Sequence, residues 1–386
     1  MKKSELFDFD TPVERRGTAS MKWEKYKNQD IIPLWVADMD FRSPPAVIRA
    51  IQQRAAYGVF GYTLPPEELN QIVISMLQKI YDWSVKPEWL VWLPGLVTGI
   101  NLACRAVGAD GDDVMTAVPV YPPFLSAPGF WRRNLIKVPL KEKNNRWQFD
   151  FNRLEQMITE KTRIFILCNP HNPVGRVYTR DELTALAVIC NRHDIVICSD
   201  EIHCDLILDE DKAHIPTATL DPEVAARTIT LMAPSKTFNL PGLGCALAVI
   251  SEKKLRRQFK NAMAGIVPSP NVLGYAAAIA AFGECDDWHA ALLDYLRGNR
   301  DTVERAIQQM PPFSIAPVEA TYLAWIDMRS AGLKNPAKFF EKAGVGLQDG
   351  IEFDGPGFAR LNFGCSRSLL DKALERMTAA VEKVSQ

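Results

Sequence analysis

The residues best suited to chemistry lie in three polar segments of the chain. Lys236, in a loop rich in glycine and hydroxyl groups, is either a solvated surface charge or, if its pKa is lowered, a nucleophile that forms a Schiff base. Asp200 and Glu201 form an acidic pair that could bind a metal, cap a helix or hold a cationic ring nitrogen. The segment 168–175 holds two Asn-Pro steps, which force extended or turn backbone and so aim the amide side chains.

Each segment closely follows an apolar run that predicts a buried strand. Such runs alternate with segments of helical spacing, which is typical of a mostly parallel sheet covered by helices on both faces. In these sheets ligands bind beyond the carboxyl ends of the strands, so we expect the three segments to meet at one site. The expected strands are 90–93, 113–118, 135–138, 163–168, 195–198, 228–232 and 245–250.

Helical spacing predicts the elements that connect these strands. The run Ser43-Pro44-Pro45 predicts a helix start, with a proline at the first helical position after a serine cap. After residue 282 the pattern changes, and we expect a large domain over 46–285 and a small α+β domain formed by 1–45 and 286–386. The expected helices are 45–56, 67–81, 97–107, 151–158, 181–193, 273–282, 286–310, 336–343 and one from 368, with further strands at 322–326 and 358–363.

Composition indicates an ordinary globular protein. The 386 residues are 47% hydrophobic and 24% charged, which excludes a disordered, collagenous or membrane-embedded chain. The net charge of −1 gives no reason to expect a nucleic acid or membrane partner. The first eight residues lack an apolar core, so no signal peptide is expected. Prolines interrupt the uncharged stretch 261–283, so neither half of it is long enough for a membrane-spanning helix. Eight scattered cysteines without metal-ligand spacing predict buried thiols, no metal site and a cytoplasmic location.

Taken in order, these segments resemble those of the fold type I pyridoxal-phosphate (PLP) enzymes, the aspartate aminotransferase superfamily. The resemblance spans about residues 7–380 and is most specific to the cystathionine β-lyase and C–S lyase branch. It implies PLP as the cofactor and an α/β fold in which helices cover a mostly parallel seven-stranded sheet, with a smaller α+β domain beside it. It rests on WVADMDF at 35–41, FGYT at 60–63, NPHNPVG at 169–175, SDEIH at 199–203 and APSKTFNLPGL at 233–243.

The resemblance also implies a role for each polar residue at the PLP ring. Lys236 would form the Schiff base with PLP and then serve as the proton-transfer base. Asp200 would pair with the ring nitrogen and keep it protonated. Tyr121 would stack on the ring and could protonate the departing sulfur, and Asn172 and His203 would contact the phenolic oxygen of the ring.

The phosphate and substrate sites follow from the same resemblance. Arg360 would grip the substrate α-carboxylate with its planar fork, and Ala37 would also contact the substrate. Tyr62 would reach the phosphate of the neighbouring subunit, so the resemblance implies a homodimer with shared active sites. The other phosphate contacts would come from Gly95, Leu96 and Val97 at the start of a helix and from Ser235.

Three positions depart from the pattern of many aminotransferases. Those enzymes have an arginine that anchors the phosphate eight residues after the lysine, and this chain has Gly244 there. A similar loss is usual in the C–S lyase branch, and it leaves open how the phosphate is held. Ala233 stands where others have serine, and His203 where aspartate aminotransferases have tyrosine.

The expected activity is therefore that of a PLP-dependent C–S β-lyase, which converts a sulfur amino acid into a thiol, pyruvate and ammonia. An aminotransferase is the first alternative, because it uses the same lysine, aspartate and arginine. A second alternative is a regulatory partner of a transcription activator, since the same branch includes the maltose-regulon modulator. The physiological substrate stays open among cystathionine, cystine and other cysteine conjugates.

Overall fold

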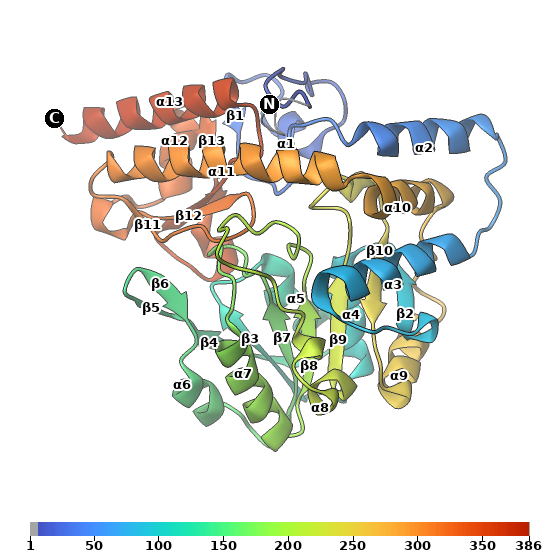
Figure 1. The fold of residues 1–386 in the computed structure, drawn as a ribbon. Coiled ribbons are helices and arrows are strands. Elements are labelled where there is room, and N and C mark those ends of the chain that lie inside the picture. The colour runs from blue at the N-terminus through green and yellow to red at the C-terminus, as the bar shows by residue number, and fades with distance from the viewer. Residues whose placement is uncertain (1–6, 386) are drawn as a thin grey trace.

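A seven-stranded sheet forms the centre of the computed structural model, which describes residues 7–385 (Figure 1). From one edge to the other, its strands are β2 (Leu90–Leu93), β10 (Ala246–Val249), β9 (Thr228–Met232), β8 (Val196–Asp200), β7 (Thr162–Cys168), β3 (Asp113–Val118) and β4 (Asn134–Pro139). Strand β10 is antiparallel to both of its neighbours, and the other neighbouring pairs are parallel. The seven strands and their mostly parallel arrangement confirm the sequence prediction.

Helices cover both faces of this sheet. Along β7, Ile164 and Ile166 pack into the core under one layer, and Phe165 and Leu167 pack under the other, because successive side chains of a strand point to opposite faces. This explains why β7 is continuously apolar from Ile164 to Cys168. One layer consists of α4 (Leu96–Ala106), α5 (Pro122–Phe130) and α9 (Lys253–Met263), and the other of α3 (Glu67–Tyr81), α6 (Phe151–Gln156), α7 (Arg180–Arg192), α8 (Pro222–Ala226) and α10 (Val272–Glu284).

The C-terminal part builds a second, antiparallel sheet beneath two long helices (Figure 1). Its strand order is β11 (Ser314–Ile315), β12 (Leu323–Asp327), β15 (Phe358–Asn362) and β14 (Gln348–Asp349). The N-terminal arm joins this part, because its strand β1 (Ile32–Pro33) pairs in parallel with β13 (Val345–Gly346). The division at residues 45 and 285 stays a prediction. The α-helices of this part are α11 (Asp286–Gln308), α12 (Pro336–Lys342) and α13 (Arg367–Ser385), and the remaining α-helices and strands of the described chain are α1 (Met21–Glu24), α2 (Pro45–Ala56), β5 (Lys141–Lys143) and β6 (Arg146–Gln148).

Several elements lie where the sequence predicted no regular structure. Helix α5 starts at Pro122 and holds Pro128 inside it, and such a proline-rich run is more typical of a loop. Helix α9 buries Leu255 and Phe259, which are four positions apart, among many cationic residues. The hairpin of β5 and β6 was also not predicted.

The helix α2 begins as predicted, but Ser43 does not cap it. Pro44 occupies the N-cap position, and the hydroxyl of Ser43 instead donates to the carbonyl oxygen of Asn239 at 3.1 Å. All eight cysteines are buried and free, which confirms the predicted burial. Within residues 7–385 no helix combines the length and the apolar character that a membrane crossing needs. The expectation that the first eight residues form no signal peptide rests mostly on residues 1–6, which lie outside the described part.

Candidate active site

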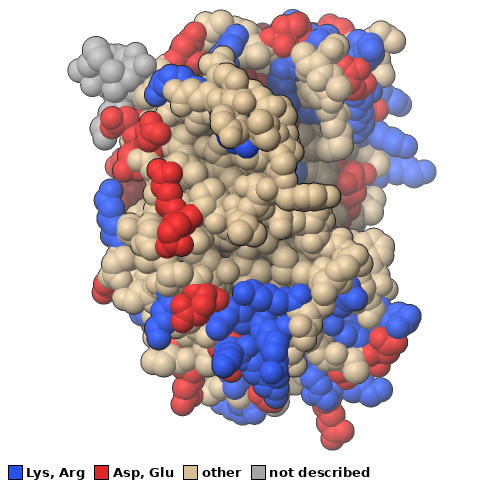
Figure 2. Space-filling view, turned by 90° about the vertical axis from the view of Figure 1, so that its right-hand side faces the viewer, with Lys and Arg blue, Asp and Glu red and all other residues tan. Residues whose placement is uncertain are grey.

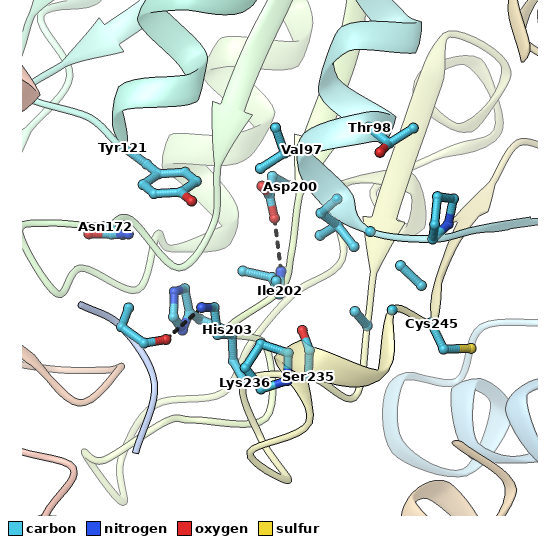
Figure 3. Close-up of a pocket in the computed structure, with 18 of the residues that line it drawn as sticks. Val97, Thr98, Tyr121, Asn172, Asp200, Ile202, His203, Ser235, Lys236 and Cys245 are labelled. Atoms are coloured by element: carbon cyan, nitrogen blue, oxygen red, sulfur yellow. Dashed lines mark hydrogen bonds between the residues drawn. The ribbon is translucent and has the colours of Figure 1, made fainter. Parts of the chain in front are cut away.

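A cavity of about 210 Å³ opens at the carboxyl ends of the parallel strands (Figure 3). Its walls come from the loops after β2, β3, β7, β8 and β9, and from residue 37 of the N-terminal arm. The three polar segments singled out in the sequence therefore do meet at one place. Ten of the twelve predicted site residues line this cavity: Ala37, Gly95, Leu96, Val97, Tyr121, Asn172, Asp200, His203, Ser235 and Lys236.

Lys236 follows β9 and points into this cavity rather than into solvent (Figure 3). Its Nζ donates a hydrogen bond of 2.6 Å to the carbonyl oxygen of Ala37. Burial, together with the positive charge of Arg360, lowers the pKa of Lys236 to about 8. A lysine with this pKa has a substantial neutral fraction near neutral pH, which makes its amine a nucleophile or a base.

The acidic pair after β8 divides between two environments. Asp200 faces the cavity, and its Oδ1 accepts a hydrogen bond of 3.1 Å from the backbone N–H of Ile202. Burial raises the pKa of Asp200 to about 7. Glu201 is fully buried and points away from the cavity, where its carboxylate accepts hydrogen bonds from Ser199, Thr217 and His214.

The three explanations that the sequence left open for the acidic pair can now be compared. The described residues contain no group of three His, Cys, Asp or Glu side chains that could hold a metal ion. Asp200 ends a strand and is followed by a turn rather than by a helix that it could cap. The arrangement therefore favours Asp200 as the partner of a cationic group inside the cavity.

His203 and Tyr121 supply polar atoms to the walls of the cavity. The Nδ1 atom of His203 is buried and has no hydrogen-bond partner among the described residues. Burial and the charge of Lys236 hold the pKa of His203 well below its usual value, so its ring is neutral. Tyr121 precedes α5, and burial raises the pKa of its hydroxyl, which therefore stays protonated at neutral pH.

Arg360 lies on β15, next to the cavity. It contacts Asn172 of the cavity wall but does not itself line the cavity. It is only 2% exposed, and none of the described carboxylates lies within ion-pair distance of it. Its Nη1 donates to Oδ1 of Asn172 at 2.9 Å, and its Nη2 donates to the carbonyl oxygen of Trp35 at 2.9 Å and to Oε1 of Gln348. Burial lowers the pKa of Arg360 to about 10. A buried guanidinium without a counter-ion is suited to bind an anionic ligand.

The N-terminus of α4 forms the opposite wall. Gly95 is its N-cap residue and offers no side chain to the first backbone N–H groups, so these are available to an anion. Gly244 has a φ of +57°, and a Cβ atom there would come within 3.1 Å of the carbonyl oxygen of Pro94. An arginine at this position would thus be strained, which gives a physical reason for its absence. Thr98 also lines the cavity, although the sequence analysis did not select it.

A segment that we call the active-site strap, residues 35–41, carries Ala37 to the cavity. Its carbonyl groups are held from several directions: Asn362 donates to Val36 and Asp38, and the hydroxyl of Tyr322 donates to Ala37 at 2.9 Å. No local sequence motif marks Tyr322, Asn362 or Gln348, so their roles could not be predicted. Tyr62, by contrast, is fully exposed and lies outside the cavity of this single chain.

The chain is similar in sequence and in structure to known proteins. The sequence pattern of aminotransferase class I and II matches residues 29–377, so the chain belongs to that family. Cystathionine β-lyase PatB of Bacillus subtilis (strain 168) is 36% identical and aligns over 97% of this chain and 100% of its own length. The crystal structure of OvoB has a TM-score of 0.95 and 46% identity, and the match covers 97% of this chain and 99% of that one. The PLP-bound C–S lyase of Staphylococcus hominis has a TM-score of 0.91 and 31% identity, over 97% and 98% of the two chains.

Proposed function

We propose that the protein is a PLP-dependent C–S β-lyase, which eliminates a thiol from the Cβ atom of a sulfur amino acid and leaves pyruvate and ammonia. The observation that carries the proposal is a single cavity in which Lys236 has a pKa of about 8, Asp200 has a pKa of about 7, and Arg360 lies behind the wall. The likeness to PatB and to the C–S lyase of Staphylococcus hominis supports this activity over transamination.

The residues around the cavity fit PLP group by group. The amine of Lys236 suits the aldehyde, and the carboxyl group of Asp200, which faces the cavity, suits the pyridine nitrogen. The unpartnered Nδ1 of His203 suits the phenolic oxygen, and the free N–H groups at the start of α4, after Gly95, suit the phosphate. When bound, PLP supplies an electron sink that stabilises negative charge at the Cα atom of an amino acid.

Four residues of the chain each have a separate role in the elimination. Arg360 holds the α-carboxylate and so fixes the Cα–H bond toward Lys236, whose Nζ takes the proton. Asp200 holds a proton at the ring nitrogen. Tyr121 keeps its hydroxyl proton near neutral pH, because burial raises its pKa, and it can deliver that proton to the departing sulfur.

Incubation with L-cystathionine tests the reaction. We expect equal amounts of pyruvate and ammonia with no added keto acid, and no detectable turnover in Lys236→Ala. An exposed lysine of α9 gives the matched control, since Lys260→Ala should keep full activity. Product formation that depends strictly on an added keto acid would instead identify an aminotransferase.

The segment between α2 and α3 supports a homodimer. Tyr57, Val59, Phe60, Tyr62 and Leu64 are all exposed on it, and the face that carries α2, α3 and α10 has uncharged side chains across its middle (Figure 2). An exposed apolar patch of this kind is typical of a protein interface. A second copy of the chain seated there would bring its own Tyr62 toward this cavity. Eight free thiols support a reducing location, the cytoplasm.

A further inference from the structure

The register of the small sheet places Gln348 directly opposite Arg360. Strand β14 pairs antiparallel with β15, and these two residues are Cα partners in that ladder. Side chains of partners lie on the same face and within contact distance. The amide oxygen of Gln348 accepts a hydrogen bond from Nη2 of Arg360, and its Nε2 donates to Oε2 of Glu352 at 2.9 Å. The pair is therefore set by the backbone of the sheet.

This contact competes with a carboxylate because of the shape of the guanidinium group. An arginine can grip a carboxylate with two parallel bonds along either of two edges, one formed by Nε and Nη2 and the other by Nη1 and Nη2. Both edges use an N–H of Nη2. In Arg360 the two Nη2 bonds go to the carbonyl oxygen of Trp35 and to Gln348. A substrate carboxylate therefore displaces one of these two acceptors.

Gln348 is the acceptor that can leave. The carbonyl oxygen of Trp35 belongs to the active-site strap, whose neighbouring carbonyl groups are fixed by Asn362. Gln348 is half-buried, and its oxygen is at the end of a flexible side chain. Its amide nitrogen can keep its bond to Glu352 while the oxygen turns away from Arg360.

We propose that Gln348 is a place-holder for the substrate α-carboxylate: in the free enzyme its amide oxygen accepts a hydrogen bond from Nη2 of the buried Arg360, and it gives up this bond when substrate enters. This rests on the proposed function only in taking an amino acid as the ligand. The place-holder lowers the affinity for every amino-acid substrate, since each carboxylate must displace it. It determines KM and leaves the chemical step unchanged.

Two substitutions of opposite effect test this role. Gln348→Leu removes the competing oxygen, and L-alanine should bind the PLP-loaded protein about threefold to tenfold more tightly. Gln348→Glu puts a carboxylate on Arg360, and L-alanine should bind at least about tenfold more weakly. Calorimetry measures both affinities. Gln308, which is exposed at the end of α11 and does not line the cavity, gives the control Gln308→Leu with unchanged affinity.

Kinetics with L-cystathionine give the second readout. KM should rise in the order Leu, Gln, Glu at position 348 while kcat stays within about twofold. A weaker affinity of Gln348→Leu for L-alanine would overturn the place-holder role and make Gln348 a substrate contact. Affinities that follow the expected order in a protein that releases no pyruvate would sustain the place-holder and refute the lyase. Pyruvate release with the same KM for Leu, Gln and Glu at position 348 would support the lyase and refute the place-holder role.

Discussion

Asp200 is a cavity residue whose acid–base behaviour is strongly changed by its surroundings. It lies in a cavity wall without a cation in direct contact, and burial raises its pKa from 3.8 to about 7. Between about pH 4 and pH 7, the folded chain without PLP therefore keeps a proton on Asp200 that the unfolded chain has already released. The resulting loss of stability grows as the pH rises from about 4 to 7 and stays at its full size above that. A cationic ligand at this carboxylate would remove the penalty.

The substitution Asp200→Asn should stabilise the cofactor-free protein in a pH-dependent way. Its gain in Tm over the wild type should be larger at pH 8 than at pH 5 by at least about 3 °C, because one pKa unit corresponds to about 1.4 kcal/mol. The same variant should bind PLP more weakly. Thermal unfolding at the two pH values measures the gain, and exposed Asp211→Asn serves as control. Equal gains at both pH values would show that Asp200 is ionised throughout.

The residues at the cavity could be predicted from sequence because they stand next to strands. Lys236, Asp200 and Asn172 each follow an apolar run, and parallel strands bring such positions to one edge. Gln348 gives no such signal, since its contact with Arg360 depends on the register of a two-residue strand. Polar residues that follow long strands can thus be assigned to the cavity from sequence. The pairing of short strands is decided by tertiary packing and cannot be predicted in this way.

Among the elements, the active-site strap depends on a buried ion cluster in the N-terminal arm. Lys22 of α1 is fully buried; its Nζ contacts Oδ2 of Asp40 at 2.7 Å and donates to the carbonyl oxygen of Asp38 at 3.2 Å. Arg15 contacts Asp40 at 2.6 Å and Asp38 at 2.7 Å. Since Asp38 and Asp40 flank Met39 in the strap, this cluster helps to keep Ala37 against Lys236.

The substitution Lys22→Met should destabilise the protein by about 3 kcal/mol, because it leaves Asp40 buried with fewer partners. Urea unfolding measures this loss. The matched change Lys27→Met removes a solvent-exposed ion pair with Glu24 and should cost about 0.5 kcal/mol or less. Adding Asp40→Asn to Lys22→Met should recover part of the loss. A destabilisation no larger than that of Lys27→Met would contradict a supporting role for the cluster.

Element boundaries followed the sequence closely where one pattern dominated. The bounds of β3, β9 and α3 agree with prediction at both ends, since short runs rich in apolar and β-branched residues and clear helical spacing have no competing signal there. Helix α5 was not predicted, because Pro122 and Pro128 disfavour a helix more strongly than the apolar Phe124 favours one. Its proline at the start is compatible with a helix, and tertiary contacts with α4 and β3 decide the rest.

At the scale of the whole molecule, the face around the segment 57–64 decides the assembly. Light scattering should give the mass of two chains. Phe60→Asp should shift the protein toward the mass of one chain and weaken PLP binding by at least about tenfold, because a charge in an apolar interface is poorly compensated. Val188→Asp changes an apolar residue of α7 that is also exposed and should leave the dimer intact. A monomeric wild type with full activity would rule out the shared site.

The bonds that hold the strap connect distant parts of the chain, and this affects its synthesis. The hydrogen bond from Tyr322 to Ala37 spans 285 positions, and that from Asn362 to Val36 spans 326. The strap is therefore among the first segments to leave the ribosome and among the last to gain its neighbours, whereas the strands of the main sheet can assemble in between. A nascent chain released before Tyr322 would hold Lys236 and Asp200 with nothing to close over them.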